Sequence, residues 1–262
     1  MNILQVNKIS QLHDGENIIF CKTDWILEDF KRINTLNNDV IFITGNSDYC
    51  ITDDLASKAP KNIKKWYCAN RLSDNPILES IPAGVENTIA CKREGHGYVW
   101  DHAHEKTKVL SNVQTNTKTT EFLYSNFNVN TNPSHRIPIR DISKQQEYIT
   151  WHDANCSYSD FAKQILDHEG VICAQGNDRG DNHRIYETLY LGRIPLTFNI
   201  LQYKYLHNIY PIVLLKDINE LLDKETLKKR IAEVKHGPTT YLDCDYWLNK
   251  INEKAKEYNI VG

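Results

Sequence analysis

The sequence predicts an α/β fold of two lobes, each built around a largely parallel β-sheet. Short apolar runs alternate with amphipathic segments along the whole chain, which is the pattern of strands separated by helices. The length of 262 residues is enough for one large domain or two small ones. A polar, Thr- and Asn-rich stretch at residues 103–120 divides the chain into comparable halves and is the expected linker or hinge.

The first half is expected to form the N-terminal lobe, residues 1–115. Its predicted strands are Asn2–Val6, Asn17–Lys22, Val40–Thr44 and Lys65–Ala69. A helix follows the second strand, with Asp24 as its expected N-cap. The apolar face of this helix is predicted to consist of Trp25, Ile26, Leu27, Phe30 and Ile33.

The second half is expected to form the C-terminal lobe, residues 116–240. Strands are predicted at Glu121–Phe127, Val171–Ala174, Arg193–Phe198 and Pro211–Leu215. Helices are predicted near Asp141–Tyr148, at Ser159–His168 with Gly170 as C-cap, at Asn182–Leu191 ended by Gly192, at Asp217–Leu222 and at Lys224–Val234. A last helix, Asp245–Tyr258, lies in residues 241–262 and is expected to pack back on the N-terminal lobe.

Composition excludes several classes of protein. The formal net charge of -3 argues against coating a nucleic-acid backbone, so no nucleic-acid partner is expected. The seven cysteines are odd in number and contain no zinc-type pair, which favours a reducing cytoplasm. No apolar stretch approaches the ~20 residues that span a bilayer, and the N-terminus does not resemble a signal peptide. A cytoplasmic protein without a transmembrane segment is therefore expected.

The segment from Gln175 to Glu187 has the pattern of an anion-binding loop. A strand leads into a loop with Gly176, Asn177 and Gly180, and then into a helix N-terminus, whose free N–H groups favour an anion. His183 and Arg184 add donors at the same place, and Glu187 follows on the same helix face, where it can accept two ribose hydroxyls. This order indicates a nucleotide-sugar site. The alternative is an exposed Arg184–Glu187 ion pair worth under ~1 kcal/mol.

The residues HRIYETLYLGRIPL, 183–196, resemble the donor-site signature of the exostosin-like glycosyltransferases, including small viral and bacterial members, and more distantly that of fucosyltransferases. The resemblance implies the GT-B fold, in which two Rossmann-like lobes face a central cleft. It also implies that Arg184 binds the diphosphate and Glu187 the ribose. Pro195 stands where retaining enzymes of this type carry a second Glu, which favours an inverting mechanism.

Two further segments resemble parts of the same families. FLYSNF, 122–127, followed by TNPSHR, 131–136, resembles the strand and phosphate-side loop of the donor lobe, which makes Arg136 a second diphosphate ligand. IPAGVEN, 81–87, resembles a loop of the acceptor lobe and places Glu86 on the acceptor side. The resemblance also implies that the protein acts in the cytoplasm of a bacterium or of a virus-infected host cell.

The N-terminal lobe would supply the catalytic base and the acceptor contacts. Asp48 follows the strand Val40–Thr44 and is the candidate base, with a turn cap as the alternative. Asn70 ends the strand that carries Trp66 and Tyr67, which would either stack on an acceptor sugar or belong to the core. His96 and His102 are expected to face the acceptor. His102 and His104 are also possible metal ligands, although the sequence offers no convincing third and fourth partner.

No metal or other cofactor is expected. Asp243-Cys-Asp245 formally matches an Asp-x-Asp metal motif, but it lies among helices, where a helix cap explains it better. The leading hypothesis is a metal-independent, inverting glycosyltransferase that moves a sugar from a nucleoside-diphosphate sugar to a glycan hydroxyl. The alternatives are a nucleotide-sugar epimerase of similar fold and a non-catalytic glycan- or nucleotide-binding protein.

Overall fold

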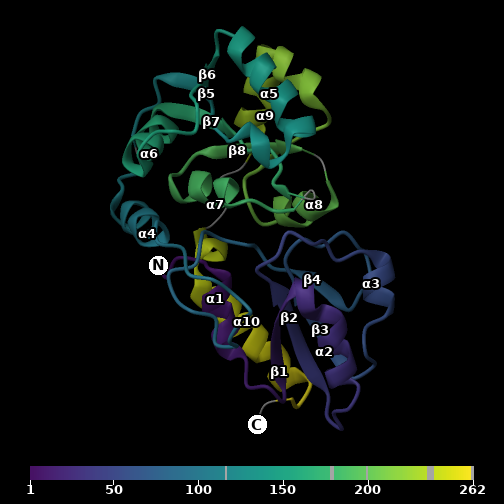
Figure 1. The fold of residues 1–262 in the computed structure, drawn as a ribbon. Coiled ribbons are helices and arrows are strands. Elements are labelled where there is room, and N and C mark those ends of the chain that lie inside the picture. The colour runs from purple at the N-terminus through teal and green to yellow at the C-terminus, as the bar shows by residue number, and fades with distance from the viewer. Residues whose placement is uncertain (116, 178–179, 199, 235–238, 261–262) are drawn as a thin grey trace. The chain divides into compact units, whose positions relative to one another are not determined.

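The computed structural model describes residues 1–115, 117–177, 180–198, 200–234 and 239–260 (Figure 1). It forms two compact units, unit 1 from Met1–Ala103 together with Thr239–Gly262, and unit 2 from His104–Pro238. The sequence places these boundaries after residues 115 and 240 instead. Each unit has its own parallel sheet, so the prediction of a mixed α/β protein with two parallel sheets is confirmed.

The sheet of unit 1 has four parallel strands in the order in which they occur in the sequence. These are β1 (Ile18–Lys22), β2 (Val40–Gly45), β3 (Ile63–Cys68) and β4 (Leu78–Ser80). The first three match predicted strands, whereas β4 is too short to show a periodicity. The prediction of a strand at residues 2–6 is wrong. Ile3 and Gln5 make only isolated antiparallel bridges, and helix α1 (Val6–Ile9) begins directly after them.

The helix α2 (Ile26–Ile33) covers one face of this sheet with Ile26, Phe30 and Ile33. These positions lie four and three residues apart, which places them on one stripe of the helix. Trp25 and Leu27 were expected on that stripe, but they are 51% and 52% exposed because the spacing turns both of them away from it. A 3-10 turn, η2 (Thr23–Trp25), precedes the helix, and no side chain caps it.

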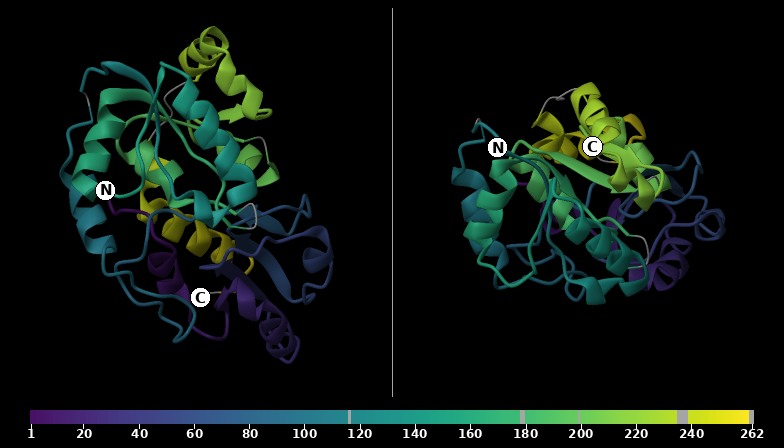
Figure 2. Two further views of the ribbon diagram at one scale, coloured as in Figure 1. Left: turned by 45° about the horizontal axis from the view of Figure 1, so that its top comes forward. Right: turned by 90° about the horizontal axis from the view of Figure 1, so that it is seen from above.

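Asp24 therefore does not act as the predicted N-cap, and its carboxylate lies 3.3 Å from the Lys22 ammonium instead. The remaining helical elements of unit 1 are η1 (Ser10–Leu12), α3 (Asp53–Ser57), η6 (Thr239–Leu242) and α10 (Cys244–Glu257). The last of these, α10, packs beside α1, as the yellow and purple ribbons of Figures 1 and 2 show. The Cys244 N–H donates to the Asn2 carbonyl oxygen at 2.8 Å.

The sheet of unit 2 has five parallel strands in the order β6-β5-β7-β8-β9. They are β5 (Glu121–Ser125), β6 (Ile149–Trp151), β7 (His168–Ile172), β8 (Ile194–Phe198) and β9 (Val213–Leu215). The chain runs from β5 to β6 on one side and then crosses to β7 on the other. The strand order therefore reverses between β5 and β7, which makes that position the topological switch point of the sheet.

Helices cover both faces of this second sheet. On one face, α5 (Pro133–Gln145), η5 (Ile218–Leu222) and α9 (Lys224–Glu233) share a core with Leu123 and Leu196. On the other face, α6 (Tyr158–Asp167) brings the Phe161 ring to 6.1 Å from the Tyr124 ring. The helix α7 (His183–Tyr190) lies on this second face too. The unit also contains η3 (Val129–Thr131) and α8 (Leu201–His207).

Three predictions for this half of the chain need correction. The expected linker begins with a helix, α4 (Ala103–Asn112), in which Ala103 and Leu110 are buried two turns apart on one face. The helix expected near Asp141–Tyr148 begins earlier, at Pro133, a residue whose fixed φ suits the first turn. Gly170 does not cap a helix but lies inside β7, where a Cβ would come within 2.7 Å of Leu196 Cδ1. None of the described helices is long and apolar enough to cross a membrane.

Candidate functional site

The candidate site lies at the switch point of the unit 2 sheet. The segments after β5 and β7 leave the carboxyl ends of adjacent strands there, which is where open α/β sheets bind ligands. Two hydrogen bonds join these segments. Arg136 Nε donates to the Gln175 carbonyl oxygen at 2.9 Å, and Asn132 Nδ2 donates to the Gly176 carbonyl oxygen at 3.1 Å. The structure thus brings together the predicted residues Arg136 and Gly176.

Arg136 is a buried cation in the first turn of α5, with 8% of its surface exposed. Its Nη1 donates to the Asn128 carbonyl oxygen at 2.8 Å, and its guanidinium lies 5.5 Å from the centroid of the Phe127 ring. These partners are polar or aromatic, and no described carboxylate pairs with the guanidinium. Burial lowers the pKa of Arg136, and repulsion from Arg184 lowers it further. A buried charge in this position is stabilised by an anion.

The loop between β7 and α7 is held by side chains from its own lobe. The Tyr203 hydroxyl donates to the Gly180 carbonyl oxygen at 3.2 Å, and Asn182 Nδ2 donates to the Ala174 carbonyl oxygen at 3.3 Å. The Tyr186 hydroxyl bonds the Asp181 carboxylate. Asn177 is exposed in this loop, whereas residues 178 and 179 of the predicted segment lie outside the described residues. Both ends of the loop are therefore fixed.

The first turn of α7 carries the predicted residues His183 and Arg184, both half-buried. The Arg184 guanidinium stacks 3.7 Å from the centroid of the Phe161 ring, a favourable cation–π contact. Its Nε lies 3.6 Å from Glu187 Oε2. Its Nη1 is buried and makes no hydrogen bond to any residue that the structure describes. One arm of the guanidinium fork therefore lacks an acceptor, and such an unsatisfied buried donor is costly.

Glu187 is deeply buried, with 3% of its side chain exposed. The Lys106 ammonium, from α4, lies 3.1 Å from its Oε1 atom, and Arg184 lies beside its Oε2 atom. Each oxygen of the carboxylate thus faces a cation. The exposed ion pair considered as an alternative for Arg184 and Glu187 does not describe this arrangement.

The candidate base Asp48 is exposed in the turn after β2. Asn70 is 5% exposed, and its Nδ2 donates to the Ser47 carbonyl oxygen at 2.8 Å, which joins the turns after β2 and β3. Trp66 is fully buried, and its Nε1 donates to Thr44 Oγ1 at 2.9 Å. Of the two interpretations of Trp66, the structure supports the core residue.

Two other predicted acceptor residues lie next to each other. His102 is exposed, and its Nε2 lies 3.7 Å from Glu86 Oε1. The Trp100 ring, itself half exposed, is 6.0 Å from the His102 ring. His104 lies on α4 in unit 2 and is exposed. Asp243 caps α10 by accepting the Asp245 N–H at 3.1 Å, so the helix cap explains this motif.

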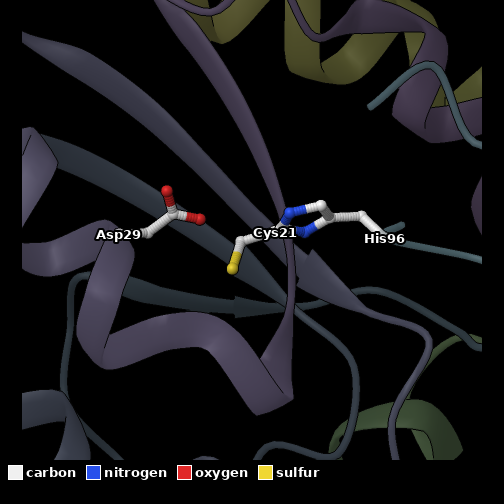
Figure 3. Close-up of side chains that lie close together, drawn as sticks. All are labelled: Cys21, Asp29 and His96. Carbon is white, nitrogen blue, oxygen red and sulfur yellow. The ribbon is translucent and has the colours of Figure 1, made fainter. Parts of the chain in front are cut away.

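His96 belongs to a buried group with Cys21 and Asp29, whose ligand-type atoms all lie within 4.8 Å of one another (Figure 3). His96 Nδ1 accepts the Lys22 N–H at 2.9 Å, and the Asp29 carboxylate accepts two bonds from the Arg93 guanidinium at 2.5 and 2.9 Å. Burial and the charge of Arg93 lower the pKa of His96 to about 4, and burial raises the pKa of the Cys21 thiol.

A metal ion fits this group poorly. The thiol would have to lose a proton that burial holds, and the ion would have to displace the Arg93 guanidinium from Asp29. The hydrogen bonds instead tie the segment around His96 to β1 and α2. The group is therefore structural, and His96 holds a loop in place rather than presenting its ring to solvent.

No protein-family model and no curated protein matches the chain. Among solved structures, an α1,3-fucosyltransferase is similar at 11% identity and a TM-score of 0.44, covering 97% of this chain and 84% of that one. An α1,3-fucosyltransferase with GDP-fucose is similar at 12% identity and a TM-score of 0.40, covering 92% and 90%. At these values the likenesses carry no argument about function, which rests on the residues of this chain.

Two residues of the candidate site escaped prediction, Lys106 and Phe161. Lys106 lies in the stretch interpreted as a linker, although the spacing of Ala103 and Leu110 indicates a helical face there. Phe161 was part of a predicted helix, but nothing local shows that its ring meets Arg184. The switch point was missed as well, because the three-residue strand β6 was not recognised.

Proposed function

We propose that unit 2 binds a nucleoside-diphosphate sugar and that the protein is a glycosyltransferase. The observation that carries this proposal is the pair of arginines at the switch point. Arg136 is buried with no described carboxylate beside it, and Arg184 holds a buried Nη1 that no described acceptor satisfies. Burial lowers the pKa of Arg136, and repulsion between the two arginines lowers it further. A diphosphate between them removes that repulsion and supplies the missing acceptors.

The other predicted donor residues surround this pair. Gly176 and Asn177 lie in the loop after β7, and His183 begins α7, whose N-terminal N–H groups favour negative charge. We propose that these groups bind the donor and stabilise the leaving diphosphate without a metal ion. In the transfer, the acceptor oxygen bonds the anomeric carbon, the carbon–oxygen bond to the diphosphate breaks, and a base takes the hydroxyl proton.

Unit 1 supplies the proposed acceptor side. Asp48 is the proposed base, and an inverting transfer needs only this one carboxylate. His102 and Glu86 are the proposed contacts to the acceptor glycan, since they pair with each other next to the exposed ring of Trp100. Asn70 and His96 hold the loops of this unit, so we assign them an indirect role in acceptor binding.

The proposal is tested by thermal shift with UDP, GDP, CDP and their sugar conjugates, with and without EDTA. A ligand at a hundred times its dissociation constant adds about 2.7 kcal/mol, a clear rise in melting temperature. We expect one nucleotide to stabilise the wild type regardless of EDTA, and expect Arg136→Met and Arg184→Met to abolish the shift. Arg140→Met is the matched control, because Arg140 lies on α5 and pairs with Asp141 at 2.6 Å.

Chromatography of a reaction with the stabilising nucleotide-sugar then identifies the chemistry. A glycosyltransferase releases the nucleoside diphosphate and lengthens an acceptor glycan. Conversion of the nucleotide-sugar to its epimer without an acceptor would identify an epimerase instead. If the nucleotide-sugar binds but neither product forms with any acceptor of a panel, the protein is a nucleotide-binding protein and the transferase proposal is rejected. The absence of any nucleotide shift would reject the donor site itself.

A further inference from the structure

We infer that Lys106 is a ligand-binding residue of the donor site, and that Glu187 holds Lys106 and Arg184 in place for the diphosphate instead of binding the ribose. This inference rests on the proposed function and adds a residue to its site. It also changes the role that the sequence assigns to Glu187.

The geometry around Glu187 is that of a shared counter-ion. Its Oε1 lies 3.1 Å from the Lys106 ammonium and its Oε2 lies 3.6 Å from Arg184 Nε. Aromatic rings of α6 support both cations, since the ammonium lies 5.4 Å from the centroid of Tyr158 and the guanidinium 3.7 Å from that of Phe161. One cation thus lies at each oxygen of the carboxylate, and the contacts join α4, α6 and α7.

A ribose cannot reach this carboxylate unless the side chains that bury it move. Glu187 Oε1 is buried and makes no hydrogen bond to a described residue, although the Lys106 ammonium lies 3.1 Å from it. The Glu187 side chain is 3% exposed, and each of its oxygens already faces a cation. A hydroxyl that displaced Lys106 or Arg184 would break an ion pair between a half-buried cation and a buried carboxylate, which is unfavourable. The carboxylate therefore serves the cations and not the ligand.

The charges at the site leave an excess for an anion. Lys106, Arg184 and Arg136 bring three positive charges against the one negative charge of Glu187, so this set has a net charge of +2. The nearby Asp181 carboxylate accepts from the Tyr186 hydroxyl and from the Asn182 N–H at 2.8 Å, but these neutral donors leave its negative charge in place, so the described set including Asp181 has a net charge of +1. The diphosphate of a nucleotide-sugar is negatively charged and is attracted by this excess.

The unsatisfied Nη1 donor of Arg184 agrees with a role of this residue in binding an anion. Arg184 uses Nε toward Glu187, while its buried Nη1 bonds no described residue. A guanidinium that pairs with a protein carboxylate through one side can bind a second anion through its other side. Because the Glu187 carboxylate also pairs with Lys106, it does not neutralise the charge of Arg184 completely.

Titration calorimetry of the full chain tests the inference with UDP, GDP, their 2′,3′-dideoxy forms and inorganic pyrophosphate. We expect Lys106→Met to lower the affinity for pyrophosphate, and for whichever nucleotide the wild type binds, by about tenfold or more. This is the usual effect of losing a charge-assisted contact. Lys106→Arg keeps the charge and should restore most of the affinity. Lys108→Met is the matched control, because Lys108 is exposed on the same helix.

Glu187→Gln separates the two roles of the carboxylate. If Glu187 holds the cations, this variant lowers the affinity for the ribose and dideoxyribose nucleotides by the same factor. It also lowers the affinity for pyrophosphate. An effect confined to the nucleotide with ribose hydroxyls would overturn the inference. Equal affinities of Lys106→Met and Lys108→Met would overturn it too. Melting temperatures, with Lys106→Arg as a folded reference, show whether a loss of binding reflects unfolding.

Failure of the proposed function is recognised separately. If the wild type binds pyrophosphate but no nucleotide, and Lys106→Met abolishes that binding, the anion site stands and the nucleotide-sugar proposal fails. If the wild type binds a nucleotide and Lys106→Met binds it equally well, only the inference fails. A wild type that binds none of the probes rejects both.

Discussion

Protonation of His96 should destabilise unit 1 as the pH falls. The pKa of this imidazole is about 4 in the folded chain, against about 6.5 when unfolded. The unfolded state therefore binds the proton more tightly, so the stabilising effect of the neutral ring is complete above pH 6.5 and is lost as the pH falls toward 4. Protonation also removes the Nδ1 acceptor from the Lys22 N–H.

The magnitude follows from these two pKa values. Between pH 7.5 and pH 5, the free energy of unfolding should fall by about 2 kcal/mol through this group alone. His96→Gln can keep an acceptor near the Lys22 N–H but does not titrate, so its stability should lack this contribution. Other buried histidines titrate in both proteins and cancel in the difference.

Urea unfolding at pH 7.5 and pH 5, followed by tryptophan fluorescence, measures the effect. Trp66 lies in the core of unit 1 and reports its unfolding. We expect the stability difference between wild type and His96→Gln to change by about 2 kcal/mol between the two pH values. An unchanged difference would refute the reasoning, since it would mean that His96 has the same pKa in the folded and unfolded chain.

Three further changes test other parts of the structure. Gly84→Ala should destabilise the protein by at least about 2 kcal/mol in urea titrations, because Gly84 has a φ of +67° and an added Cβ would lie 2.3 Å from the Leu4 carbonyl oxygen. Trp66→Phe should cost about 2 kcal/mol or more by the same measurement, since it leaves a cavity and removes the bond to Thr44. Arg136→Lys should weaken nucleotide binding about tenfold in calorimetry, because lysine cannot make both the Nε and Nη1 bonds, and Arg140→Lys should not.

Elements with a strong local pattern were predictable, and elements without one were not. The long apolar runs that became β1, β2 and β8 are recognisable because every residue of such a strand is buried or nearly so. The strands β4 and β6 have three residues each, too few for a periodicity to stand out. The sequence of helix α4 resembles a linker because its apolar residues are few and its Thr and Asn residues suit loops equally well.

The residues of the candidate site divide in the same way. Arg184 and Glu187 are three positions apart on one helix, and this spacing alone places them on one face. The loop with Gly176 is likewise recognisable from the strand before it and the helix after it. His96 and Asn70 were predicted to face a ligand, but their side chains hold loops of unit 1, a role that depends on partners distant in the sequence.

Local pattern was therefore sufficient for the α/β class, for the position of the loop before α7 and for the Arg184–Glu187 pair, because each depends on residues within a few positions of one another. Tertiary structure alone decided that Arg136 bonds the Gln175 carbonyl oxygen and that Lys106 shares Glu187 with Arg184. These contacts join separate strands and helices. Their formation depends on the order of the strands in the sheet and on which face each helix covers, and the spacing of residues along the chain does not contain that information.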